Sequence, residues 1–164
     1  FEQLRNNKLL NIIPRYGAQV APIDFIYMKS VFEVVRELDG FAAGLAAEKI
    51  TPEKIEELEG IVEKIKNYDI EKDYKEIIIQ DQNFHKIIFE SAGNPCLTDI
   101  LYGLHLHTKR MWIYAQPEVG EIGLFLDTMP SIINALKTGN SEQANKYAKF
   151  HIDIFVERIK QEFF

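Results

Sequence analysis

The sequence is poor in the residues that define several protein classes. Its single cysteine, Cys96, rules out an intrachain disulfide and a cysteine-based zinc motif, and it suits a reducing cytoplasm. Its apolar runs are interrupted well before the roughly 20 residues that a membrane-spanning helix needs. Basic residues are the minority, 19 against 25 acidic ones, and a net charge of -6 argues against a nucleic-acid surface formed by bulk electrostatics.

The beginning of the chain also lacks two features. It has no initiator methionine, and Phe1 to Arg5 do not form the basic stretch and apolar run of a secretory signal. We therefore expect a cytoplasmic chain that is part of a longer protein. The 164 residues are 46% hydrophobic and 27% charged, as in an ordinary globular domain, and they suffice for one principal core.

The first 22 residues differ in pattern from the rest. They are locally basic and read as the end of a helix followed by strand, turn and strand, with Pro14 and Gly17 bracketing the turn. A lone two-stranded hairpin is only marginally stable in water, so this one needs a partner. We predict that 1–22 is the remnant of one domain and that 23–164 forms another.

Residues 23–164 show helical periodicity throughout. Thr51 and Pro52 are typical of a helix start, and Gly93 and Gly139 of helix ends. Pro130 is expected to interrupt or restart a helix. The pattern predicts an all-α antiparallel bundle of six or seven helices behind the β-hairpin, with helices over 25–50, 52–66, 71–91, 95–115, 120–137 and 141–164.

Polar residues interrupt two of the apolar stripes. Asp81 and His85 lie four residues apart on one helix, and His151 lies in the middle of the stripe of the last helix. A divalent metal would satisfy one carboxylate and two imidazoles in an apolar bundle. The alternative is an Asp81–His85 ion pair beside a hydrogen-bonded His151.

Two further histidines lie close together in the sequence. His105 and His107 point in different directions on a helix, and either can face a pocket at the bundle centre. His107 is in line with Leu104 and Met111, whereas at least one of the two is expected on the surface.

Four segments, in the same order along the chain, resemble those of a known family. Leu4–Val20 is similar to the end of a winged helix-turn-helix domain of GntR-type transcription regulators, and the remainder resembles the FCD effector-binding domain of the FadR subfamily. Lys8 stands where the family usually has glycine, and Asp39 where it often has glutamate. The FCD-like segments are Val34–Asp39 with Ala42–Ala47, Asp81–Ile88 followed by Gly93–Leu97, and Ile132–Asn140 followed by Ala144 and His151.

The resemblance implies a divalent metal at the centre of the bundle. Family ligand positions fall on Asp81, His85 and His151, and a further family histidine falls on Met129. A thioether is a poor ligand for such ions, so three protein ligands remain, which can still hold zinc, nickel or manganese with one open position.

The resemblance also implies an effector and a DNA partner. A small carboxylate effector is expected near the metal, with Arg36, His107 and Met129 as binding candidates. Arg36 can pair bidentately with an organic acid or form an interhelical salt bridge. Arg5, Lys8 and Arg15 are expected to contact DNA phosphates beside an upstream recognition helix, in a homodimer bound to operator DNA without membrane attachment.

The sequence leaves three candidate functions. The predicted one is the ligand-sensing domain of a transcription regulator, without enzymatic activity. A carboxylate-bridged dimetal enzyme would need a Glu three residues before each histidine, but Gln82 and Ala148 stand there. A purely structural dimerisation bundle, with its polar core residues merely paired, is the third.

Overall fold

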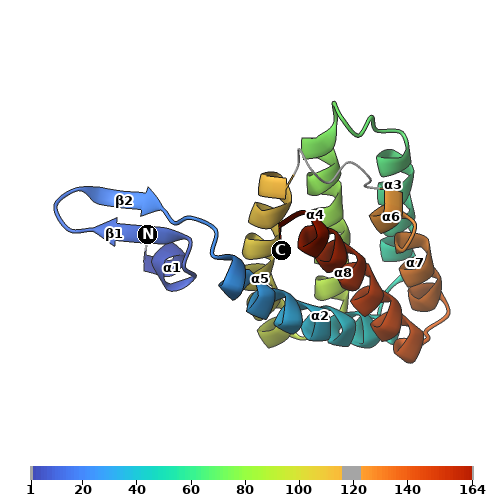
Figure 1. The fold of residues 1–164 in the computed structure, drawn as a ribbon. Helices are drawn as coiled ribbons and strands as arrows, with labels where there is room; N and C mark the ends of the chain where they lie inside the picture. Colours follow the sequence, from blue (N-terminus) through green and yellow to red (C-terminus); the bar gives the residue numbers. More distant parts are fainter. Residues whose placement is uncertain (1, 116–122, 164) are drawn as a thin grey trace.

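The computed structural model describes residues 2–115 and 123–163 as a helical bundle with a projecting β-hairpin (Figure 1). The expected all-α bundle behind a hairpin is confirmed. Its elements in chain order are α1 (Glu2–Asn6), β1 (Leu10–Ile13), β2 (Gly17–Val20), α2 (Phe25–Ala47), α3 (Pro52–Lys66), α4 (Tyr74–Ser91), α5 (Pro95–Ala115), α6 (Gly123–Leu126), α7 (Met129–Lys137) and α8 (Ser141–Phe163).

The hairpin is a two-stranded antiparallel sheet in which Leu10 pairs with Val20 and Ile13 with Gly17. Its turn is closed by a hydrogen bond from Tyr16 N to Ile13 O, and Arg15 has a φ of 70°. Lys8, just before β1, has a φ of 58°. This left-handed conformation favours glycine, which explains why the resemblance places glycine at the position of Lys8.

Most bundle helices begin and end close to the positions predicted from the sequence. The predicted helix over 120–137 is divided into α6 and α7, and residues 120–122 lie outside the described residues. Thr51 caps α3 by accepting a hydrogen bond from Lys54 N, with Pro52 in the first turn. Gly93 and Gly139 adopt φ values of 63° and 66° after α4 and α7. Pro130 lies in the first turn of α7 and begins a helix rather than breaking one, because its missing N–H is not needed there.

The long helices α2 and α8 form the most extensive helix–helix contact of the described residues. At their crossing Ser141 Oγ donates a hydrogen bond to the carbonyl oxygen of Gly44, and a Cβ at Gly44 would lie 3.1 Å from that hydroxyl. The absence of a side chain therefore lets the two backbones approach closely.

The centre of the bundle is formed by α2, α4, α5, α7 and α8, which line one continuous apolar core. The large side chains that are almost completely buried in this core include Phe84, Leu101, Met129 and Ile132. Among the described residues, no helix combines the length and apolar character required to cross a membrane. The buried polar residues described below stand out against this apolar background.

Candidate metal centre

Asp81, His85 and His151 meet at the centre of the bundle. Asp81 and His85 lie one turn apart on α4, and His151 reaches them from α8. Asp81 Oδ1 lies 3.7 Å from His85 Nε2 and 3.6 Å from His151 Nε2. The three ligand atoms lie within 4.8 Å of one another, so the structure brings together the three residues that the sequence pattern singles out.

These distances distinguish a shared ion from direct hydrogen bonding. Separations of 3.6 and 3.7 Å are too long for hydrogen bonds between a ring nitrogen and a carboxylate oxygen. Two ligands that each lie roughly 2.1 Å from one tetrahedral ion are separated by about 3.4 Å. The spacing around Asp81 is therefore closer to that of atoms sharing a metal.

Thr128 orients the imidazole of His151. It lies in the short connection between α6 and α7, and its Oγ1 lies 2.5 Å from His151 Nδ1 in a buried contact. If Nδ1 donates this hydrogen bond, Nε2 keeps its lone pair directed toward Asp81. In that tautomer the ring presents Nε2 as a ligand atom without any rearrangement.

A second triad shares His85. Asp39 on α2 and His105 on α5 form a close pair, with Asp39 Oδ1 2.9 Å from His105 Nε2. The other carboxylate oxygen, Oδ2, lies 3.3 Å from His85 Nδ1. Asp39 is only 2% exposed, so an aspartate lies in the bundle interior between two imidazoles.

Opposite charges around the cluster shift its pKa values. Burial opposes the ionisation of Asp39, but His105 and His85 outweigh it and hold the pKa of that carboxyl well below its usual range. Asp81 shows the same balance, since His85 and His151 lower its pKa despite burial. Burial would lower the pKa of His85, and the charges of Asp81 and Asp39 raise it above its ordinary value.

The donor set of the Asp81 triad fits a divalent metal. One carboxylate oxygen and two imidazole nitrogens are ligands of zinc, nickel and manganese, and three protein ligands leave a position for water or an effector carboxylate. A dication would also balance the two buried carboxylates of Asp39 and Asp81. Without a metal, the raised pKa of His85 favours a protonated ring beside these carboxylates.

Met129 is the residue on which the resemblance places a further family histidine. It is fully buried at the start of α7, directly after Thr128. Its side chain belongs to the apolar core of the bundle.

Arg36 and His107 lie outside the cluster. The Arg36 guanidinium forms a bidentate pair with Asp153 of α8, at 2.6 and 3.0 Å, and a third contact with Glu37. It lines a surface groove of about 390 Å³ between α2 and α8. The interhelical salt bridge left open by the sequence is thus present.

His107 belongs to the junction between the bundle and the hairpin. Its ring stacks edge-on against Tyr27 at 5.6 Å, and it lines a cavity of about 440 Å³ together with Arg5, Lys8 and Arg110. Burial lowers its pKa, and Arg110 and Lys8 lower it further, against a hydrogen bond with the Asn7 backbone. The structure therefore places His105, and not His107, in the polar cluster. This cluster consists of the residues of the two triads, Asp39, Asp81, His85, His105 and His151.

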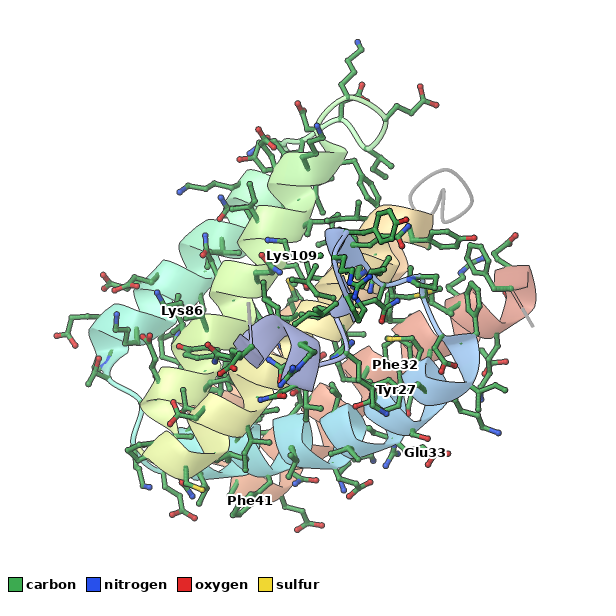
Figure 2. The ribbon with its side chains drawn as sticks, turned by 90° about the vertical axis from the view of Figure 1, so that its left-hand side faces the viewer. Tyr27, Phe32, Glu33, Phe41, Lys86 and Lys109 are labelled. Atoms are coloured by element: carbon green, nitrogen blue, oxygen red, sulfur yellow. The ribbon has the colours of Figure 1, made fainter. Side chains whose placement is uncertain are left out.

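The three residues expected to contact DNA lie in the hairpin segment. Arg5, Lys8 and Arg15 are all exposed. The Lys8 ammonium lies 4.0 Å from the centre of the Tyr27 ring, where the π face attracts it. Figure 2 shows Tyr27 on α2, seen from the side on which the hairpin projects.

Comparisons with known proteins agree with this architecture. The FCD domain model matches residues 30–153, and the chain belongs to the FCD domain family. No curated protein matches the sequence significantly. Membership in this family supports an effector-binding domain of a transcription regulator.

Solved structures of transcription regulators share the fold. Escherichia coli McbR/YncC has a TM-score of 0.88 at 19% identity, over 99% of this chain and 82% of that one. A GntR-family regulator from Pseudomonas syringae pv. tomato has a TM-score of 0.75 at 18% identity, over 98% and 67%. Streptococcus agalactiae GntR has a TM-score of 0.64 at 19% identity, over 96% and 77%.

Proposed function

We propose that this chain is the ligand-sensing part of a cytoplasmic transcription regulator that binds a divalent metal through Asp81, His85 and His151. The observation that supports this proposal best is the spacing of their ligand atoms, 3.6 and 3.7 Å around Asp81 Oδ1. When bound, the ion would act as a Lewis acid that attracts a carboxylate to its open position.

The chain's own residues would prepare this site. Thr128 holds the ring of His151, and Asp81 carries a negative charge at neutral pH because its neighbours lower its pKa. Asp81 is the least buried of the three candidate ligands, with a side-chain exposure of 13%. A small organic acid would approach the open position from its side, with Met129 contributing apolar contact.

The effector would act by binding one arrangement of a homodimer more tightly than another. Such a preference shifts DNA binding only by the difference between the two affinities. The operator would be read by a winged-helix domain, and Arg5, Lys8 and Arg15 would add phosphate contacts. Arg36 and His107 remain candidates for effector contacts at the groove and at the hairpin junction.

Native mass spectrometry of the chain purified without chelators tests the metal site. We expect a dimer with one metal-sized mass per chain after zinc addition, and loss of that mass in Asp81→Asn and His151→Gln. His107→Gln is the matched control, because it removes a buried histidine outside the cluster and should keep the metal. A metal-free wild-type chain after addition of zinc, nickel and manganese would contradict the proposal.

The structural dimerisation bundle makes a different prediction. The close contact between Asp39 and His105 supports a cluster that is satisfied by ion pairing alone. In that case neither metal nor small carboxylates would change the melting temperature. A sensor should instead be stabilised by zinc, by about 2.7 kcal/mol at a hundredfold excess over the dissociation constant, and further by a chelating carboxylate.

A further inference from the structure

Asp39 is the most deeply buried charged residue of the polar cluster that is not itself a proposed ligand. Its Oδ2 is buried without a hydrogen bond of good geometry in the described residues, although it faces His85 Nδ1 at 3.3 Å. Its Oδ1 is fixed by His105 Nε2 at 2.9 Å. One oxygen of this buried carboxylate therefore contacts His105 and the other faces His85, a proposed metal ligand.

The two nitrogens of His85 face different carboxylates. Nδ1 faces Asp39, and Nε2 faces Asp81 at 3.7 Å. A neutral imidazole has one N–H and one lone pair, and only the nitrogen with the lone pair can bind a metal. A carboxylate close to Nδ1 favours the proton there, so the lone pair of Nε2 points into the Asp81 triad.

We propose that Asp39 is a positioning residue for the metal centre: it holds the His85 ring in the Nδ1–H tautomer, and His105 holds Asp39 in place. The inference rests on the proposed metal function. It assigns a role to two residues outside the ligand set, one on α2 and one on α5. The centre would then depend on four long helices, α2, α4, α5 and α8.

The distances favour positioning over a second metal site at Asp39, His85 and His105. The Asp39–His105 separation of 2.9 Å is that of a hydrogen bond, and it is shorter than two ligands of one ion normally allow. A second ion would also require His85 to bind metal through both nitrogens. The Asp81 triad, with its longer spacing, needs only Nε2.

Zinc affinity and the tautomer of His85 together test the proposal. We expect Asp39→Asn to weaken zinc binding roughly 10- to 100-fold in a competition with a chromophoric chelator. His105→Gln should weaken it less, because Asp39 stays in place with more freedom. The matched control is Glu33→Gln, which neutralises an exposed carboxylate of α2 (Figure 2).

The second readout uses the metal-free protein, at a pH where the His85 ring is neutral. Long-range ¹H–¹⁵N spectra should show His85 as the Nδ1–H tautomer in the wild type and as a mixture in Asp39→Asn. A merely structural role for Asp39 would lower the melting temperature but leave the tautomer unchanged.

The possible failures are distinguishable. Unchanged zinc affinity and tautomer in Asp39→Asn, with zinc bound by the wild type, would overturn the positioning role and leave the metal site standing. Two zinc ions per wild-type chain would also overturn it, since Asp39 would then be a ligand. A wild-type chain that binds no zinc would refute the proposed metal function itself.

Discussion

The hairpin segment and the helical bundle are held together by different forces. None of the residues of α1 is buried, and β1 and β2 are exposed except for the half-buried Leu10. Each long bundle helix instead buries an apolar stripe in one core. The bundle can therefore be stable by itself, whereas the hairpin depends on its few contacts with α2 and α5.

Those few contacts include a cation–π pair and a hydrogen bond. Lys8 lies over the ring of Tyr27, and the Arg110 guanidinium donates to the carbonyl oxygen of Ala21. His107 lies beside them on α5, two residues from His105 in the polar cluster. Different faces of the same helix thus contact the polar cluster and the hairpin segment.

The largest expected difference comes from one substitution made in both regions. Ile132→Ala in α7, where the residue is 1% exposed, should lower the free energy of unfolding by about 2–5 kcal/mol through lost burial and a cavity. Ile12→Ala in β1, where the residue is 46% exposed, should cost about 0.5 kcal/mol or less. Urea denaturation measures both, and equal losses would show that the hairpin is packed as tightly as the core.

Helical periodicity explains why the fold and three of the five cluster residues could be predicted. Asp81, His85 and His151 lie on stripes whose neighbours, such as Phe84 and Phe155, are buried as expected. A polar residue in the middle of such a stripe must face the interior. The periodicity along a single helix is enough to identify such an inward-facing polar residue.

Asp39 and His105 could have been found by the same signal. Asp39 follows Phe32 and Val35 on the buried stripe of α2, and His105 follows Leu97 and Leu101 on that of α5. However, α5 has apolar residues on a second face, and its periodicity favours His107 equally well. Which face meets α2 is decided by how the helices cross, and no single-helix pattern contains that information.

The next largest effect is expected from the hydroxyl that orients His151. Thr128→Val keeps the side-chain shape but leaves His151 Nδ1 without this buried partner, so it should cost about 1–3 kcal/mol. Tyr102→Phe is the control, because its hydroxyl bonds Glu90 on the surface. Chemical denaturation of metal-free protein compares the two, and a loss in Tyr102→Phe as large as that in Thr128→Val would rule out a special role for the buried bond.

In metal-free protein, His85 in the bundle and His107 at the hairpin junction should make opposite contributions to the pH dependence of the free energy of unfolding. The pKa of His85 is raised, so its contribution to stability is complete below pH 6.5 and is lost as the pH rises through its folded-state pKa. The pKa of His107 is lowered, so its contribution is complete above pH 6.5 and is lost as the pH falls.

Substitution of each histidine can separate the two opposite pH dependences of stability. His85→Asn should remove part of the stability loss on the alkaline side, and His107→Gln part of the loss on the acidic side. The measurement is the free energy of unfolding of each variant relative to wild type between about pH 5 and pH 8. Differences that change with pH in the same direction for both variants would contradict the assignment.

The smallest effect is expected where the hairpin rests on the bundle. Lys8→Gln removes the ammonium that lies 4.0 Å from the centre of the Tyr27 ring, a contact worth about 0.5–1 kcal/mol at an exposed site. Because the bundle does not depend on the hairpin, its global unfolding should hardly change. Hydrogen exchange should instead accelerate at the amides of β1 and β2 while those of α4 and α8 keep their rates. Equal acceleration in α8 would show that the two regions unfold as one unit, and the contrast between a self-supporting bundle and a dependent hairpin would then be wrong.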